Sequence, residues 1–522
     1  MTTEYIVGKA PLIRYFLMLG AFLIFMPGLQ AQFNFDENCQ RTYQAILSLQ
    51  FSEAHRLIEI EKETDPSNLI PLYLENYIDF LTLFIGEDRN VYHLLKENKP
   101  DRISRLEKGW KDTPYHDFCL AEVHIQWAFA RLKFGDYTSA AFEIRKAHAL
   151  FSANETKYPS FVVNKIGLGM VHVIVGIIPE NYKWVADLMG LDGSMETGIK
   201  EIRQVAEYTG SDKIALLYKP EALFYLAFLA ANLQKNKKDA LPVLNLLNNQ
   251  HNDIQSLKSP LLIFANASVL MKNGQNDEAL ALLQERTSLS QRYPFYYLDY
   301  LEGMARLNTL DFTASGYFEK FIKNFKGQNY LRSAYQKLSW IALLRGDTVK
   351  FHQIMRHVQA KGVSNIDEDK QAVNEAEKNT LPNVILLRAR LLFDGGYYSR
   401  ALNELLYNSI KASVKSKRDM IEYNYRLGRI YHETGNLTKA LEYYRQTIKQ
   451  GSKEPFYFAA GAAYQMGLLY ENTGDWVKAD SAYHNCLSIN TREYKTSLNQ
   501  KAKAGLIRVE KLCLKPEADR RR

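Results

Sequence analysis

Residues 424–445, NYRLGRIYHETGNLTKALEYYR, contain the pattern that decides the fold, because two other segments repeat it. Residues 385–406 read ILLRARLLFDGGYYSRALNELL, and residues 463–484 read AYQMGLLYENTGDWVKADSAYH. Self-similarity at a fixed period is the sequence signature of a repeat architecture. Five positions correspond, each stepping by 39 residues: Ala389, Gly428 and Gly467; Leu392, Tyr431 and Tyr470; Gly396, Gly435 and Gly474; Ala401, Ala440 and Ala479; Leu405, Tyr444 and Tyr483.

Each of the five positions has a physical reason in a pair of antiparallel helices. A small residue lets the first helix touch the second, and the large aromatic residue fills the space beside it. The glycine takes the left-handed conformation that ends the first helix, and the alanine marks where the second helix crosses closely. Neither helix buries its apolar face alone, so neighbouring pairs must stack. We therefore predict an all-α fold in which residues 385–487 form three stacked helical hairpins.

The central copy resembles the tetratricopeptide repeat, whose L-G-x2-Y…A-x3-F spacing it meets at Leu427, Gly428, Tyr431, Ala440 and Tyr444. The period of 39 exceeds the usual value of about 34, which implies inserted residues between pairs. Weaker copies are recognisable upstream, at residues 267–283, 128–147 and 51–66. The resemblance implies an α-solenoid of tetratricopeptide-like hairpins, irregular in the N-terminal two thirds and regular at the C-terminus, that serves as a protein-binding scaffold.

The N-terminus has the pattern of a secretory signal peptide. Lys9 and Arg14 precede an apolar run at residues 15–26, and the small residue Ala31 follows. The run is too short for a stable span of about 30 Å of hydrocarbon. We therefore expect cleavage after Ala31, with an uncleaved anchor as the alternative. The expected location is the periplasm or the outer membrane.

A polar stretch at residues 362–380 separates the weak copies from the regular ones, and we interpret its charge run as a solvated face or loop. The expected organisation is a signal peptide (1–31), an irregular tetratricopeptide-like superhelix (32–361), this polar boundary segment (362–380), regular repeats (381–515) and a basic tail (516–522).

Composition excludes several classes of protein. The 522 residues are 46% hydrophobic and 12% aromatic, which argues against intrinsic disorder. The formal net charge is +8, but basic residues are interspersed with acidic ones, so we expect no nucleic-acid partner. The four cysteines are scattered without a CxxC or Cys/His pattern, which predicts no zinc site. Whether Cys486 and Cys513 pair is left open.

The sequence offers no recognisable catalytic constellation. It contains no HExxH, GxSxG or Walker motif. His352 and His357 are five residues apart, so they would point to different sides of a helix. We therefore predict no enzyme activity, no cofactor and no metal.

Binding in the groove of the regular repeats is the favoured function, because the first helix of each tetratricopeptide hairpin lines the concave side. Arginine binds carboxylates, and aromatic rings supply contact area for an extended peptide. The alternative is that these residues are merely solvated, and they do not reproduce the Lys/Asn pattern with which some family members hold a C-terminal carboxylate. Counted from the small residue of each copy, the predicted groove residues are Asn383, Leu386, Arg390, Phe393, Glu422, Tyr425, Arg429, His432, Tyr464, Leu468 and Glu471.

The stretch GLGMVHVIVGII, residues 167–178, departs from the repeats. It lacks the G-x-G-x-x-G spacing of a dinucleotide loop, and it is too short for a membrane span. We predict a buried helix in which Gly169 and Gly176, seven residues apart on one face, let another helix come close. Gly167 is likewise expected to be structural, and His172 to be a satisfied histidine at the core or its rim.

The following residues, IIPENYKWVADLMGLDGSMETGIKEI (177–202), carry a second resemblance. An apolar helix, a proline, a short aromatic helix and a glycine-rich turn make residues 120–290 similar to a eukaryotic tetratricopeptide family. That family includes inclusion-clearance proteins of the mitochondrial outer membrane and the human tetratricopeptide proteins numbered thirty-nine. The resemblance implies a scaffold with a link to membranes or lipid, and no catalytic residues. Alternatively, residues 161–190 could line an apolar ligand pocket between helices.

Overall fold

The computed structural model describes residues 31–177, 190, 193–232, 237–249, 259–286, 291–378, 380–407, 414 and 416–513. Every named element among these residues is an α-helix, which confirms the predicted all-α fold. An isolated bridge joins Gln32 and Asn68. The predicted signal peptide up to residue 30, the segment 178–189 and the basic tail lie outside the described residues.

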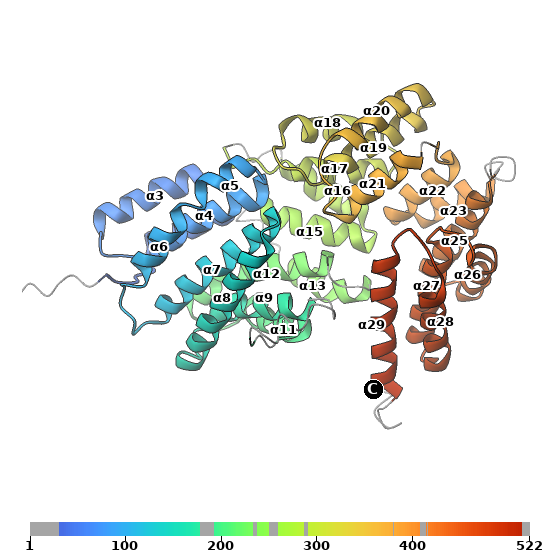
Figure 1. Cartoon of the computed structure of the whole chain (residues 1–522). Helices are drawn as coiled ribbons and strands as arrows, with labels where there is room; N and C mark the ends of the chain where they lie inside the picture. The colour runs from blue at the N-terminus through green and yellow to red at the C-terminus, as the bar shows by residue number, and fades with distance from the viewer. Residues whose placement is uncertain are drawn as a thin grey trace, which may run out of the picture. The chain divides into compact units, whose positions relative to one another are not determined.

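The chain forms two compact units, whose helices are labelled in Figure 1. Unit 1 takes in the described parts of residues 1–233, 241–265 and 287–295, and unit 2 takes in the rest. Unit 1 contains α2 (Glu37–Leu47), α3 (Phe51–Thr64), α4 (Ile70–Gly86), α5 (Arg89–Leu95), α6 (Asn98–Leu106), α7 (Pro114–Phe134), α8 (Tyr137–Lys157), α9 (Asn164–Ile177), α11 (Met195–Ala206), α12 (Lys213–Asn232), most of α13 (Lys237–Asn249) and the start of α15 (Pro260–Asn273). Unit 2 contains α16 (Asn276–Glu285), α17 (Tyr297–Asn308), α18 (Ala314–Asn324), α19 (Leu331–Leu344), α20 (Thr348–Ala360), α21 (Asp367–Lys378), α22 (Val384–Asp394), α23 (Tyr398–Tyr407), α25 (Lys417–Glu433), α26 (Leu437–Gly451), α27 (Phe458–Asn472), α28 (Trp476–Ser488) and α29 (Lys495–Cys513).

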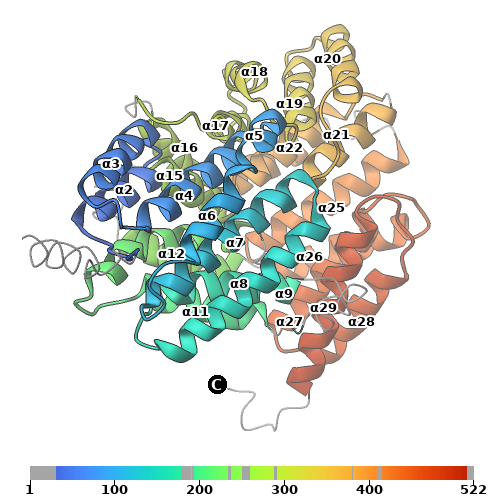
Figure 2. The same cartoon turned by 60° about the vertical axis from the view of Figure 1, so that its left-hand side comes forward.

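The three regular copies form the predicted hairpins α22–α23, α25–α26 and α27–α28, and α29 packs against the last one (Figures 1 and 2). The first helix of each hairpin is followed by a glycine with positive φ, namely Gly396, Gly435 and Gly474 at +84°, +79° and +76°. Asn436 and Asp475 then start the second helices of two hairpins by accepting hydrogen bonds from backbone amides three residues on. The repeat pattern therefore describes both ends of each inter-helix turn.

In the second and third copies the small residue faces the large aromatic residue of the same hairpin. A Cβ atom on Gly428 would lie 2.7 Å from the ring of Tyr444, and one on Gly467 would lie 2.4 Å from the ring of Tyr483. Both tyrosines are fully buried. The structure also places Ala401, Ala440 and Ala479 completely inside the core. A larger side chain at any of these positions would push the two helices apart.

Two of the weak upstream copies are also hairpins. In α7–α8, Gly135 has a φ of +84° and Ala140 is fully buried. In α15–α16, Gly274 has a φ of +81° and Ala279 is fully buried. The glycine and the alanine thus keep their geometry where the aromatic positions of the motif have degenerated.

Residues 167–177 belong to α9, which crosses α11 at very short distance. A Cβ atom on Gly169 would lie 2.7 Å from the carbonyl oxygen of Gly198, and one on Gly176 would lie 2.4 Å from the backbone nitrogen of Met195. Gly167 lies against the ring of Phe151 of α8. His172 is half-buried, and its Nδ1 lies 2.6 Å from a carboxylate oxygen of Glu201 on α11.

Most charged side chains of the segment 362–380 are exposed, as expected of a solvated face, and Asp369 is the exception. Residues Asp367–Lys378 form α21, which packs against α19 and α20. Asp369 is fully buried. Its carboxylate accepts hydrogen bonds from the backbone amides of Tyr330 and Ser333, at 2.7 and 2.9 Å, which replace those it would make with water. Burial raises the pKa of this carboxyl to about 6.

Candidate peptide-binding groove

Two adjoining pockets lie on the first helices of the C-terminal hairpins in unit 2. The larger has a volume of about 440 Å³ and is lined from α19, α21, α22, α25 and α27. The smaller has a volume of about 260 Å³ and is lined from α22, α25, α27 and α29. They share four lining residues, so we treat them together as the groove: Arg390, Arg426, Tyr457 and Tyr494.

Most of the predicted groove residues line these pockets. Asn383, Leu386 and Glu422 line the larger pocket, Arg390 lines both, and Phe393, Tyr425, Arg429 and Tyr464 line the smaller one. The other three have partners elsewhere in the hairpins. His432 Nδ1 lies 3.2 Å from the Tyr444 hydroxyl, Leu468 packs against the core, and Glu471 accepts two hydrogen bonds from Arg508.

Three arginines form the centre of the groove, and each lies over an aromatic ring. The Arg390 guanidinium is 5.1 Å from the ring centre of Trp340, Arg429 is 4.9 Å from that of Phe393, and Arg426 is 5.9 Å from that of Tyr425. Stacking on a ring fixes the plane of a guanidinium and leaves its edge for an acceptor. The arrangement therefore holds three permanent positive charges in fixed orientations.

The arginines differ in how well their charges are already balanced. Arg426 donates to Glu422 at 2.9 and 3.2 Å, in a pair that is almost fully buried. Arg390 has only a long contact of 3.7 Å with Asp394, whose side chain is 47% exposed. Arg429 contacts Glu433 at 3.6 Å, and its buried Nε has no hydrogen-bond partner among the described residues. Arg390 and Arg429 can therefore take a further acceptor.

The two pockets differ in net charge. The smaller is lined by Arg390, Arg426, Arg429 and Lys501 against Asp394, which gives four positive charges less one negative, or +3. The larger has four basic and four acidic lining residues and is neutral. Among the acidic ones, Glu493 is paired with Lys378 and Arg418 at 2.5 and 3.1 Å. An anionic group is therefore favoured in the smaller pocket.

Tyrosines supply the remaining surface of the groove. Tyr457 packs edge-on against both Tyr425 and Tyr494, with ring centres 5.7 and 4.8 Å apart. Burial raises the pKa of Tyr494 and that of Tyr464 to about 12, so both hydroxyls remain protonated at neutral pH. A bound segment would meet flat rings carrying hydrogen-bond donors, which suits extended polypeptide.

Sequence reasoning missed several groove residues for identifiable reasons. Arg426 and Gln465 lie two residues before Gly428 and Gly467, at a position of the motif that was not counted as facing the groove. The shared offset in two copies is the signal that could have found them. Trp340 and Lys501 come from α19 and α29, which carry no clear copy of the motif, so nothing in the sequence places them here.

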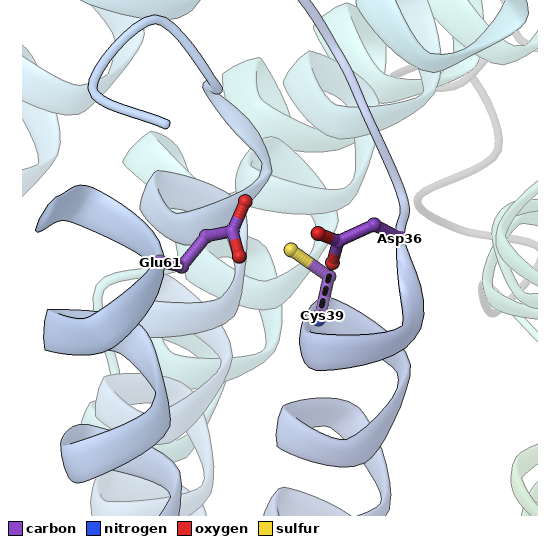
Figure 3. Close-up of side chains that lie close together, drawn as sticks. All are labelled: Asp36, Cys39 and Glu61. Carbon is purple, nitrogen blue, oxygen red and sulfur yellow. Dashed lines mark hydrogen bonds between the residues drawn. The ribbon is translucent and has the colours of Figure 1, made fainter. Parts of the chain in front are cut away.

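A cluster of Asp36, Cys39 and Glu61 in unit 1 has the ligand types of a metal site, with the three ligand atoms within 4.8 Å of one another (Figure 3). Each group has a structural role instead. Asp36 caps α2 by accepting from the Cys39 amide at 2.8 Å, and Glu61 accepts from Asn38 and Asn68 at 3.0 and 2.8 Å. Burial and both carboxylates raise the pKa of the Cys39 thiol strongly, whereas metals bind the thiolate. The cluster joins α2 to α3.

The cysteine pair left open by the sequence is only partly visible. Cys486 is a buried free thiol of α28, and burial raises its pKa to about 11. The side chain of Cys513 lies outside those that the structure describes.

Comparisons with known proteins place one repeat in a family. A model of the tetratricopeptide repeat matches residues 421–449, which cover α25 from Ile421 and most of α26. No curated protein matches the chain significantly. Among solved structures, yeast Tom70 is 13% identical, with 92% of this chain and 89% of that chain covered and a TM-score of 0.23. The Cut9–Hcn1 hetero-tetramer of APC/C is 13% identical, with 91% and 96% covered and a TM-score of 0.23. These comparisons do not confirm the family that residues 120–290 resemble. The match covers one repeat, so residues 421–449 of the chain are similar to the tetratricopeptide repeat.

Proposed function

We propose that the chain is a non-enzymatic scaffold that binds an extended segment of a partner protein in the groove of unit 2. An acidic side chain or terminal carboxylate of that segment lies in the smaller pocket, against Arg390 and Arg429. The observation that carries the proposal is the net charge of +3 in a pocket walled by aromatic rings.

The energetics favour a carboxylate over a neutral group. The Arg390–Asp394 contact of 3.7 Å is long and exposed, so displacing Asp394 sacrifices little. A carboxylate that accepts two N–H groups of one guanidinium makes shorter and stronger hydrogen bonds than a neutral acceptor. Arg429 also lines the smaller pocket, and its contact with Glu433 is long, at 3.6 Å.

The experiment is a selection of random peptides on the mature chain, followed by binding measurements on single variants. Lys501→Gln removes a charge from the smaller pocket, and its matched control is Lys503→Gln, an exposed lysine of the same helix outside the pocket lining. We expect selected peptides to be rich in Asp and Glu, and to bind the Lys501 variant several-fold more weakly than the control. Peptides without acidic enrichment, or equal binding to both variants, would contradict the proposal.

The proposed location of the scaffold is the cell envelope, in the periplasm or at the outer membrane. The basis is the basic lead, the apolar run at 15–26 and the small residue Ala31. A link to lipid was suggested for residues 161–190, and the described part of that segment is largely core. Fractionation of the native host, probed for the chain, tests the location; recovery in the cytoplasm would contradict it.

A further inference from the structure

Unit 1 contains an apolar cavity of about 100 Å³ between α4, α7, α9, α12 and the start of α15. Nearly half of its lining residues are aromatic, among them Phe80 from α4, Phe129 from α7 and Phe228 from α12. The aliphatic lining residues include Leu262 of α15 and Met170 of α9. Among the described lining residues of this cavity, Met170 is the one that belongs to the segment 161–190, and the others come from outside it. The cavity is therefore not the pocket that the sequence suggested within that segment.

The lining residues with polar side-chain atoms are Tyr77, Glu221, Tyr225 and Ser259, and protein groups already hold the carboxylate and the serine hydroxyl. The carboxylate of Glu221 accepts hydrogen bonds from the hydroxyls of Tyr77, at 2.6 Å, and Tyr43. The Ser259 hydroxyl donates to the backbone oxygen of Leu47. The lining contains no lysine, arginine or histidine. The lining therefore offers no positive charge to an anion, and tyrosine hydroxyls already hold the Glu221 carboxylate, so we expect the ligand to be a hydrocarbon group.

The helix that supplies Phe224 and Phe228 is unusual in composition. Among the described helices, α12 is the one that is long and apolar enough to cross a membrane by length and composition, and half of it is buried inside the protein. The Glu221 carboxylate of α12 accepts hydrogen bonds from the hydroxyls of Tyr43 and Tyr77. These bonds make α12 a core helix of unit 1. Two of its apolar side chains that line the cavity, Phe224 and Phe228, are half-buried.

The half-buried rings mark the side from which a ligand can enter. Phe84 and Phe228 have ring centres 6.5 Å apart, and Phe224 stacks on Phe228 at 6.3 Å. All three are half-buried, whereas the lining residues Leu81, Leu262 and Ser259 are buried. Small apolar cavities stay dry and take up benzene when they reach about 150 Å³. An unfilled cavity leaves its lining without contacts on one side, so occupation is favourable.

We propose that this cavity, which we call the phenylalanine pocket, binds one hydrocarbon group, the end of an alkyl chain or a single aromatic ring. Any charged or polar part of the ligand stays outside, beyond Phe84 and Phe228. The site is independent of the groove in unit 2, and it adds an apolar ligand to a protein whose proposed partners are peptides.

The test uses the mature chain with isotope-labelled methionine methyl groups, titrated with 1-hexanol and with benzene. We expect the Met170 signal to shift saturably with at least one probe, and the other methionine signals to stay in place. A response to hexanol alone identifies an alkyl source, and a response to benzene alone identifies an aromatic one. No saturable shift of Met170 with either probe would overturn the proposal.

A cavity-filling variant supplies the second readout. Leu262→Phe places a larger side chain in the pocket, and Leu441→Phe makes the same change on the half-buried face of α26 in unit 2. We expect Leu262→Phe to weaken binding of the active probe at least tenfold and Leu441→Phe to leave it unchanged. Equal binding by both variants would place the probe elsewhere and refute the site. If Leu262→Phe does not fold, the Met170 titration of the parent chain decides alone.

Discussion

Gly467→Ala is the sharpest test of the hairpin geometry, because the ring it would strike has nowhere to move. The new Cβ would lie 2.4 Å from Cε1 of Tyr483, which is fully buried. A Cβ on Gly505 of α29 would also lie 2.5 Å from this ring, at Cζ. The Tyr483 hydroxyl also donates to Glu471 at 2.5 Å. The tyrosine ring therefore packs against two glycines.

The magnitude follows from two opposing terms. Overpacking a rigid core costs about 1–3 kcal/mol. Replacing glycine by alanine inside a helix gains about 1 kcal/mol. We expect Gly467→Ala to destabilise the protein by up to about 2 kcal/mol. Gly316→Ala in α18 is the matched control in the same unit, because a Cβ there meets nothing within 4 Å, and it should be neutral or slightly stabilising.

A double-mutant cycle in denaturant unfolding separates the clash from other effects. Tyr483→Leu alone should destabilise, since a buried ring is lost. On that background Gly467→Ala should become stabilising, because only the helix-propensity term remains. If Gly467→Ala has the same effect in the parent chain and in the Tyr483→Leu background, or stabilises the parent chain, the assignment of this contact is wrong.

Three further predictions concern buried charges and the N-terminus. Burial and the nearby Glu221 carboxylate raise the pKa of Glu122 well above its usual value. The folded chain therefore keeps a proton that the unfolded chain releases above pH about 4.3. The free energy of unfolding accordingly falls as pH rises. Glu122→Gln should therefore stabilise the chain increasingly from pH 5 to pH 8 in unfolding titrations; a constant difference would count against this. Burial and Arg390 lower the pKa of Lys337 to about 7, so stability should rise with pH by at most about 1.4 kcal/mol per unit from pH 7 towards 10, and Lys337→Met should abolish that rise. The mature chain should begin near Gln32 when sequenced from its native host, and a start at Met1 would argue against cleavage.

The hairpins were predictable because their requirements are local. The small residue Gly428 and the buried Tyr444 contact each other within one copy, and Gly435 with its positive φ lies in the turn between their helices, so the three keep their spacing in the sequence. The groove residues could be predicted by counting from the small residue of each copy. This holds for Arg390 and Arg429, which the structure brings into one pocket.

The rest could not be predicted because it depends on contacts between helices far apart in the chain. Trp340 of α19 and Tyr494, which precedes α29, reach the groove from outside the regular copies. The phenylalanine pocket combines Phe80, Phe129 and Phe228 from three helices without a shared period. The burial of Asp369 depends on the amides of Tyr330 and Ser333, which turn an acidic stretch into a packed helix.

Site-specific photo-crosslinking in the native host tests the groove most directly. A photoreactive residue at Gln465 lies in the smaller pocket, and one at Gln446 of α26 lies outside the pocket lining and serves as the control. We expect the residue at position 465 to crosslink a partner through a segment containing Asp, Glu or a C-terminal carboxylate, and the residue at position 446 not to do so. We also expect Arg429→Gln to abolish the crosslinked product. A partner captured equally from both positions, or one that persists with Arg429→Gln, would contradict the assignment of the groove as the binding site.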